Sequence, residues 1–374
     1  MTIIVGYYKL LCVGLLGATL IKKKVCFWLD SNISGLLPMF KGSIYACCNR
    51  AIPLIKQKKY SELTYEEIQQ KRIELFNSMN SEKDSPCKNC TFLVEKEDDK
   101  IDIGRISRLI LFPHTTCNFN CQYCFFTNKD RKTKIDEELC NIYDILKNFY
   151  NIGLLEDDFT LDLGGGEPLL LDNIDKTFKF MEDYYPKSTF FLVSNYSISS
   201  KVDNLIKILK NRKIKTVLKT SIDCGTKETY AVLRKKDAFK TVYKNLLKSA
   251  KSGIFDTIYL KYIIMGDGSN SDLKDLDGFI SLCKRIKKYN KNETRVILDA
   301  NVMDQTDTKR IFSARRKKSV IFTPKHLNNI EMKTAKYLYK NLIDFVSVKF
   351  NGDRLIPAYK EAREDIEEIK NSIK

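Results

Sequence analysis

The feature that most constrains this chain is a regular alternation of strand-like and helix-like segments that begins at Arg105. Short runs of β-branched and aromatic residues, bounded by polar or glycine-containing turns, are typical of buried strands. Segments with helical spacing of apolar residues separate these runs. The strand candidates are Ser107–Phe112, Phe159–Leu163, Thr189–Val193, Val217–Ile222, Ile258–Ile264 and Arg295–Leu298, and the helix candidates are Ile135–Tyr150, Asp172–Tyr185, Lys201–Lys210, Tyr230–Lys251 and Leu273–Tyr289.

This alternation predicts an α/β fold with a parallel sheet. Repeated βα units imply parallel strands joined by right-handed crossovers. A partial (β/α)6 TIM-like barrel and a doubly wound sheet both satisfy the pattern. In either fold, ligands bind at the carboxyl ends of the strands, so we expect the functional residues there.

The same alternation divides the 374 residues into three predicted domains. Residues 1–104 form a Cys-rich amino-terminal domain, residues 105–310 form the α/β core, and residues 311–374 form a helical carboxyl-terminal extension. In that extension, Met332–Val346 and Lys360–Lys374 have helical patterns.

Composition restricts the class of protein. A hydrophobic content of 43% and a charged content of 30% are typical of a globular chain. The net charge of +17 is spread along the whole chain, so we do not expect a nucleic-acid partner. A basic face that docks an acidic electron donor is another use of this charge. The apolar run Leu10–Ile21 is too short to span a bilayer, and three lysines follow it, so we expect a buried element and no membrane span.

Three cysteines follow the first strand candidate at close spacing: Cys117, Cys121 and Cys124. Three thiolates can hold three corners of one metal centre and leave the fourth corner open. Such runs are typical of iron–sulfur clusters, whereas a structural zinc site normally closes with four ligands. His114 precedes the triad and is interpreted as a loop residue, and Cys140 falls inside a helix candidate.

The next strand ends also carry polar groups. The second strand candidate runs into Gly164-Gly165-Gly166-Glu167-Pro168. Glycines at this position let the backbone approach a ligand closely. The Glu167 carboxylate could accept charge-assisted hydrogen bonds from an ammonium group, although a plain tight turn is the simpler interpretation of this segment.

Together these motifs resemble the radical S-adenosylmethionine (SAM) superfamily. The resemblance rests on the CxxxCxxC spacing, with Tyr123 before the third cysteine, and on the GGEP segment one βα unit later. It implies that the three cysteines bind three irons of a 4Fe–4S cluster and that SAM chelates the fourth. It also implies the partial (β/α)6 barrel as the fold of the core.

The resemblance further implies a set of SAM-binding residues at the strand ends. Tyr196 stands where the family usually has glycine, and Arg234 is either near the SAM carboxylate or a surface helix residue. The residues implied at the cofactor are Tyr123, Gly165, Gly166, Glu167, Ser194, Asn195, Ser221, Asp223 and Arg234.

The amino-terminal cysteines suggest a second metal site. Cys87 and Cys90 form a CxxC pair, Cys47 and Cys48 follow a short strand candidate, and Cys26 lies upstream. With the helix candidate Tyr65–Met79 between them, these cysteines loosely resemble the SPASM and twitch modules that bind auxiliary clusters. A second 4Fe–4S cluster is the interpretation we favour, and a zinc knuckle or unligated thiols remain alternatives.

The resemblance predicts an enzyme that reductively cleaves SAM at the cluster and abstracts hydrogen from a substrate with a 5′-deoxyadenosyl radical. A peptide or protein substrate is favoured. The alternatives are a sugar, nucleotide or RNA substrate, or a non-enzymatic iron–sulfur or zinc-binding protein. The implied partner is a low-potential donor such as flavodoxin or ferredoxin, and oxygen-sensitive clusters imply a reducing, cytoplasmic location. No residue is identified as a catalytic acid, base or radical relay.

Overall fold

The computed structural model of the chain describes residues 22–26, 28–30, 35–39, 43–46, 52–56, 58–81, 85–88, 90, 93–124, 141–300, 327–350 and 360–373. Cys47, Cys48, Cys140 and the apolar run Leu10–Ile21 lie outside these residues. In the described ranges, no helix is both long enough and apolar enough to cross a membrane.

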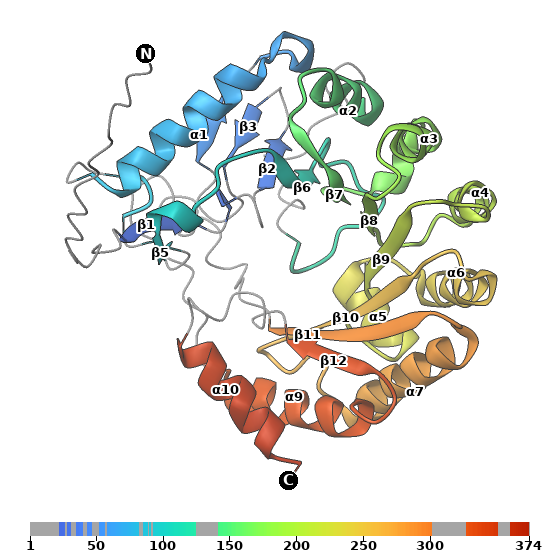
Figure 1. Cartoon of the computed structure of the whole chain (residues 1–374). Coiled ribbons are helices and arrows are strands. Elements are labelled where there is room, and N and C mark those ends of the chain that lie inside the picture. Colours follow the sequence, from blue (N-terminus) through green and yellow to red (C-terminus); the bar gives the residue numbers. More distant parts are fainter. Residues whose placement is uncertain are drawn as a thin grey trace, which may run out of the picture.

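Seven consecutive parallel strands form the centre of the fold (Figure 1). Each strand pairs with the next in the chain, so the order in the sheet follows the order in the sequence. The strands are β6 (Ile106–Leu111), β7 (Leu155–Leu163), β8 (Thr189–Val193), β9 (Lys215–Ser221), β10 (Thr257–Ile264), β11 (Glu293–Ala300) and β12 (Ser347–Phe350).

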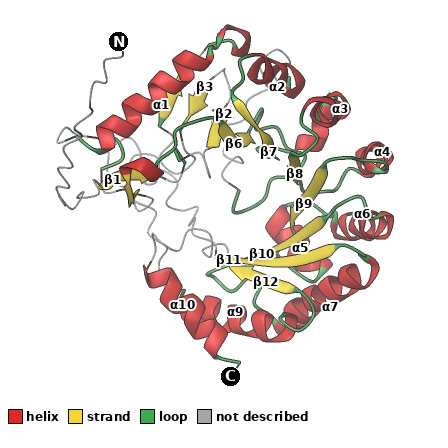
Figure 2. Ribbon diagram, in the orientation of Figure 1, coloured by secondary structure: helices red, strands yellow, loops and turns green. Residues whose placement is uncertain are grey.

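Most of the helices between these strands cover one face of the curved sheet, the outer one (Figure 2). A doubly wound sheet would reverse its strand order and carry helices on both faces. The sequential order excludes that alternative, and the partial TIM-like barrel is confirmed. The helices are α2 (Ile142–Asn151), α3 (Ile174–Tyr184), α4 (Ser199–Leu209), α5 (Lys227–Arg234), α6 (Phe239–Ser252) and α7 (Leu273–Tyr289), with a 3-10 turn at Pro168–Leu170.

Alternation along the strands separates two environments. Successive side chains of a strand point to opposite faces. On β9, Leu218 and Thr220 point outward under the helices and are fully buried, whereas Val217, Lys219 and Ser221 point inward. The outer face and the helices therefore hold the main hydrophobic core, and the inner face carries polar side chains.

The amino-terminal strands extend the same sheet. β2 (Gly35–Met39) pairs in parallel with β6, and β3 (Ser43–Tyr45) and β4 (Pro53–Ile55) follow in antiparallel order. A separate pair joins β1 (Lys22–Cys26) to β5 (Leu93–Glu97). The long helix α1 (Tyr65–Met79) is capped by Thr64, whose side chain accepts a hydrogen bond from the Glu67 amide. Short 3-10 turns at Tyr60–Glu62 and Asp98–Lys100 complete this region, and its boundary as a separate domain at residue 104 stays a prediction.

Two segments differ from the sequence-based expectations. The helix expected over Tyr230–Lys251 is wrong as one element, because Lys235 adopts φ 52°, a left-handed conformation that ends α5 before α6 begins. The carboxyl-terminal extension is also not wholly helical. α9 (Asn329–Leu342) leads into β12, which adds a strand to the sheet, before α10 (Lys360–Asn371).

One tight backbone contact holds α7 against the loop after β9. A Cβ atom on Gly278 would lie 2.4 Å from the Gly225 carbonyl oxygen. On Gly225, a Cβ atom would lie 1.9 Å from the Asp275 carbonyl oxygen. Neither backbone can yield without moving the helix, so glycine is required at both positions.

We therefore expect Gly278→Ala to destabilise the fold. Alanine normally stabilises a helix interior by about 1 kcal/mol relative to glycine, but overpacking a rigid contact costs roughly 1–3 kcal/mol. The measurement is the urea-unfolding midpoint, with Ser281→Ala on the exposed face of the same helix as control. A variant at Gly278 as stable as the control would contradict the rigid contact.

Candidate active site

The loop after β6 carries the three cysteines and lies at the carboxyl ends of the strands. Cys121 is buried, and Cys117 and Cys124 are half-buried. The Cys124 amide donates a 3.1 Å hydrogen bond to the Cys121 carbonyl, which closes a turn between two of the thiols. Burial raises the pKa of Cys121 to about 12 and also raises that of Cys117, and each of the three thiols lies within electrostatic reach of the others.

These thiols fit an iron–sulfur cluster. A thiol must lose its proton to bind metal. A bound cationic centre compensates for the free-energy cost of burying the resulting negative charge. Two N–H groups already point at the Cys117 sulfur: the Phe119 amide at 3.4 Å and the Asn195 side-chain amide at 3.6 Å. Hydrogen bonds to the sulfurs are one of the means by which a protein sets a cluster potential.

A site for a single metal ion requires a different arrangement of ligands from a site for a cluster. Among the side chains that the structure describes, no three His, Cys, Asp or Glu residues converge on a point that would hold one ion. In a 4Fe–4S cluster each thiolate binds a different iron, so three sulfurs on one loop need not converge in this way.

The glycine-rich turn after β7 packs against the backbone of the cysteine loop. The Gly166 amide donates to the His114 carbonyl, and the Glu167 amide donates to the Thr116 carbonyl, both at 2.9 Å. A Cβ atom on Gly166 would lie 2.0 Å from the Thr116 oxygen, and Gly165 has φ +105°. The close approach expected at these glycines is thus made to the residues just before Cys117. His114 is a fully buried residue of this loop, and burial lowers its pKa.

Glu167 joins two neighbouring strand ends. Its carboxylate is fully buried and accepts hydrogen bonds from the Ser194 hydroxyl (2.7 Å), the Asn195 amide (2.7 Å) and the Leu169 amide (3.0 Å). Burial raises the pKa of Glu167, and these three donors work against that effect by stabilising the charged form. In this structure Glu167 ties the end of β7 to the end of β8.

Asn195 continues this network to the cysteine loop. Its side-chain amide donates to the Asn118 oxygen at 2.8 Å, and its own oxygen accepts from the Ser197 hydroxyl at 2.7 Å. The network therefore runs from Glu167 through Asn195 to the loop that holds Cys117.

Tyr196, at the position where the family usually has glycine, does adopt a left-handed backbone with φ 58°. Its ring is fully buried under α6, where its hydroxyl shares a 2.6 Å hydrogen bond with Ser249 and its edge meets Phe255. The substitution therefore fills a space between β8 and α6, and the ring points away from the cysteine loop.

Three of the expected cofactor residues form one buried polar cluster: Tyr123, Asp223 and Arg234. The Tyr123 hydroxyl donates to an Asp223 carboxylate oxygen, and the Arg234 guanidinium forms a 3.1 Å ion pair with the same oxygen. The other Asp223 oxygen accepts from the Ile263 amide at 2.8 Å on the neighbouring strand. Burial raises the pKa of Asp223, and Arg234 opposes that effect.

Arg234 is no surface residue. It lies on the last turn of α5 with only 5% of its surface exposed. Its guanidinium sits over the rings of Phe119, Tyr123 and Tyr230, at 5.4, 5.7 and 5.9 Å from their centroids. Two of these rings belong to the cysteine loop, so Arg234 fixes that loop from the α5 side.

Asn270 and Ser221 complete the strand ends. The Asn270 amide donates at 2.8 Å to the Asp223 and Ile263 carbonyls, and its oxygen accepts from the Met265 amide, which ties the ends of β9 and β10 together. Ser221, the last residue of β9, is half-buried on the inner face beside Lys261.

The amino-terminal cysteines meet in a second hydrophobic cluster. Cys26, Cys87 and Cys90 share it with Trp28 and with Ala46, the residue before Cys47. Cys90 donates its amide to the Cys87 carbonyl at 2.9 Å, so the CxxC pair is a turn. The structure brings Cys26 and the CxxC pair into one cluster, whereas the proposed ligands Cys47 and Cys48 lie outside the described residues.

Charged residues inside the barrel are absent from the sequence-based set of site residues. They alternate with buried apolar residues within or directly after strand candidates, which is the signal that could have indicated them. The residues are Arg108, Asp162, Lys219, Lys261 and Asp299.

Comparison with known proteins agrees with this geometry. The radical SAM superfamily matches the chain over residues 111–265. Among curated proteins, GTP 3′,8-cyclase of Nautilia profundicola is 28% identical over 184 residues, which cover 49% of this chain and 54% of that protein. GTP 3′,8-cyclase of Aliarcobacter butzleri is 31% identical over 162 residues, which cover 43% and 47% of the two chains. The chain spans about half the length of the curated relatives it matches.

The solved structures that match part of this chain include two with bound S-adenosylmethionine (AdoMet). Streptococcus suis SuiB bound to S-adenosylmethionine has a TM-score of 0.47 and 16% identity, covering 79% of this chain and 58% of that chain. Native anSMEcpe with bound AdoMet and Cp18Cys peptide has a TM-score of 0.40 and 17% identity, covering 64% and 62%.

The buried ion pair predicts a large effect of removing its cation. Arg234→Met should leave the Asp223 carboxylate buried without its partner and destabilise the fold by about 3–5 kcal/mol. The free energy of unfolding in urea measures this, with the exposed neighbour Lys236→Met as control. Equal stability of the two variants would mean that the pair contributes nothing to holding the cysteine loop.

Proposed function

Because this chain belongs to the radical SAM superfamily, we propose that it reductively cleaves SAM and abstracts a hydrogen atom from a bound substrate. The cofactors of the family are a 4Fe–4S cluster and SAM, which when bound supply an electron and a 5′-deoxyadenosyl radical. The observation that carries the proposal is the docking of the cysteine loop onto the Gly165–Glu167 turn, because it places three thiols at the mouth of the barrel.

The chain's own residues have separate parts in this proposal. Cys117, Cys121 and Cys124 would hold the cluster. Glu167 orients Ser194 and Asn195, and Asn195 in turn donates to the Cys117 sulfur. We propose Glu167 as a positioning residue, since three hydrogen bonds within the protein already occupy its carboxylate.

Tyr123, Asp223 and Arg234 would close the opposite side of the cofactor site. Their mutual contacts fix the ends of β9 and α5 against the cysteine loop. A packed wall of this kind excludes water, which protects a reactive radical from side reactions.

A nucleotide is the substrate class that we propose. Two curated relatives of the core are named GTP 3′,8-cyclase, and cationic side chains line the inner face of this barrel. A peptide or protein substrate, favoured by the cysteine-rich amino-terminal region, is the second candidate. The amino-terminal CxxC pair would then serve the auxiliary cluster that accompanies such substrates.

Substrate classes can be tested directly. The reconstituted chain, SAM and dithionite are incubated with GTP, with ATP, or with a pool of short peptides, and 5′-deoxyadenosine is quantified. Addition of the true substrate class should increase its formation above the substrate-free rate. A low-potential donor of the flavodoxin or ferredoxin type is the reductant we propose in place of dithionite.

The first functional prediction concerns the cysteine triad. Replacing Cys117, Cys121 and Cys124 with Ala should abolish 5′-deoxyadenosine formation, because no thiolate would remain to hold the cluster at the strand ends. Cys283→Ala, which removes a buried thiol from α7, is the matched control and should retain activity. Continued SAM cleavage by the triple variant would end the radical SAM proposal.

The second prediction concerns the amino-terminal cysteines. If they bind a second 4Fe–4S cluster, anaerobic reconstitution should give about eight irons per chain, and the triad variant should keep about four. Cys87→Ala should lower the iron content of that variant and its solubility, because metal binding and folding are coupled in small sites. Iron-free protein in the triad variant, or stoichiometric zinc, would exclude the second cluster.

A further inference from the structure

The inner face of the barrel carries charges from five strands of the sheet. They come from β6, β7, β9, β10 and β11. Members on paired strands are offset by two residues, since Arg108 aligns with Thr160 and Lys261 with Ile297. All are half-buried, as side chains that line the inside of an open barrel would be. We call this set the inner-face cluster: Arg108, Asp162, Lys219, Lys261 and Asp299.

Most of the cations in this region have a carboxylate partner. Arg108 pairs with Asp162, and Lys261 pairs with Asp299 at 2.5 Å. Farther along β11, Arg295 pairs with Glu293 and donates a 3.0 Å hydrogen bond to the Tyr259 hydroxyl. These pairs neutralise one another within the protein.

Lys219 differs from these paired cations. It makes no side-chain hydrogen bond and no ion pair with any residue that the structure describes, although Asp162 and Asp299 lie within electrostatic reach. Burial, and next the repulsion from Lys261, lower its pKa to about 8. At pH 7 the ammonium group is still mostly protonated, so this cation has no ion-pair partner of its own among the described residues of the barrel.

The surroundings of Lys219 place it below the cofactor residues. Lys219 lies two residues before Ser221 on β9. It is therefore roughly 7 Å deeper in the barrel than Ser221. Its strand neighbours are Val193 and Tyr259, and the Tyr259 ring stacks on Phe191 with 6.0 Å between centroids. An apolar and aromatic floor next to a cation is typical of a pocket that orients a substrate by one charged group.

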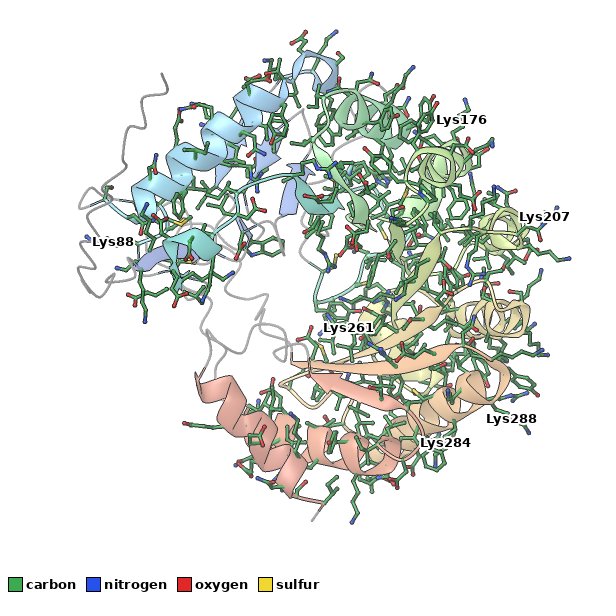
Figure 3. All side chains as sticks on the ribbon, viewed as in Figure 1. Lys88, Lys176, Lys207, Lys261, Lys284 and Lys288 are labelled. Carbon is green, nitrogen blue, oxygen red and sulfur yellow. The ribbon has the colours of Figure 1, made fainter. Side chains whose placement is uncertain are left out.

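Figure 3 illustrates how unusual an inner position is for a lysine of this chain. Lys176, Lys207, Lys284 and Lys288 project from the outer helices, whereas Lys261 lies on the inner side of the sheet. Lys219 shares that inner face, since it lies in register with Tyr259, two residues from Lys261 on the adjacent strand. The outer lysines interact with solvent, and the inner ones face the region that a substrate must enter.

We propose that Lys219, flanked by Lys261 and Arg108, binds a phosphate group of the substrate. This inference rests on the proposed function and specifies its substrate class as a phosphorylated small molecule. A phosphate carries nearly two negative charges and three acceptor oxygens, so it can bridge Lys219 and Lys261 and remove their mutual repulsion. A lone carboxylate offers one charge, and a neutral peptide backbone offers none.

The test uses inorganic pyrophosphate as the probe. Calorimetric titration of the reconstituted full chain should give saturable binding. Lys219→Met should weaken it about tenfold or more, since one charge-assisted contact is lost. Lys219→Arg, which keeps the charge, should retain most of the affinity. Lys288→Met, an exposed lysine of α7, is the control for the general positive charge of the chain and should bind like the wild type.

A second measurement needs no variant and therefore no assumption about folding. The wild-type chain is acetylated with a limiting amount of reagent, with and without pyrophosphate, and each lysine is quantified by mass spectrometry. Pyrophosphate should slow acetylation of Lys219 several-fold more than that of Lys288.

Three results would overturn the inference: no pyrophosphate binding by the wild-type chain, equal affinity in wild type and Lys219→Met, or equal protection of Lys219 and Lys288. None of these experiments requires SAM or reductant. A chain that binds pyrophosphate through Lys219 but forms no 5′-deoxyadenosine would refute only the proposed function.

Discussion

A backbone-to-backbone contact between two strand ends is the constraint on which the rest of this site depends. The turn at Gly165–Gly166 meets the carbonyls of His114 and Thr116 so closely that no side chain fits between them. Two main-chain hydrogen bonds at 2.9 Å fix the contact. Because Cys117 directly follows Thr116, the position of the first thiol is set by the end of β7. The cysteine loop is thus attached to the sheet by a link that no rotamer change can loosen.

A second set of interactions fixes the far side of the same loop, and it works by buried charge. Arg234 contacts the Asp223 carboxylate and three aromatic rings, two of which belong to the loop. Burying such a pair costs desolvation free energy, which is recovered only where every remaining acceptor has a donor. Tyr123 and the Ile263 amide provide those donors, so the carboxylate is fully engaged. The loop is therefore clamped between a tight main-chain contact on one side and a charge network on the other.

The sequence predicts the features that depend on local pattern. β8 has the expected bounds, Thr189–Val193, and the partial barrel follows from strands whose buried runs are short and regularly spaced. The break between α5 and α6 could not be predicted, since Lys235 adopts a left-handed backbone without the glycine or asparagine that usually marks one. β12 was missed because four residues after a helical pattern carry too little periodicity to indicate a strand.

The site shows the same division between local pattern and tertiary contact. The motifs predict that Glu167 lies near the cofactor, but only the folded chain shows that its oxygens accept hydrogen bonds from Ser194, Asn195 and Leu169. Similarly, a lysine within a strand candidate can be a surface residue or an interior one, and the strand pattern alone leaves Lys219 undecided. The helices that cover the opposite face determine the position of Lys219, because every second residue of β9 then points toward the barrel interior. Charge on that face costs free energy unless it is paired or used. Among the described residues of this barrel, ion pairs account for Arg108 and Lys261, and the anion that we propose would account for Lys219.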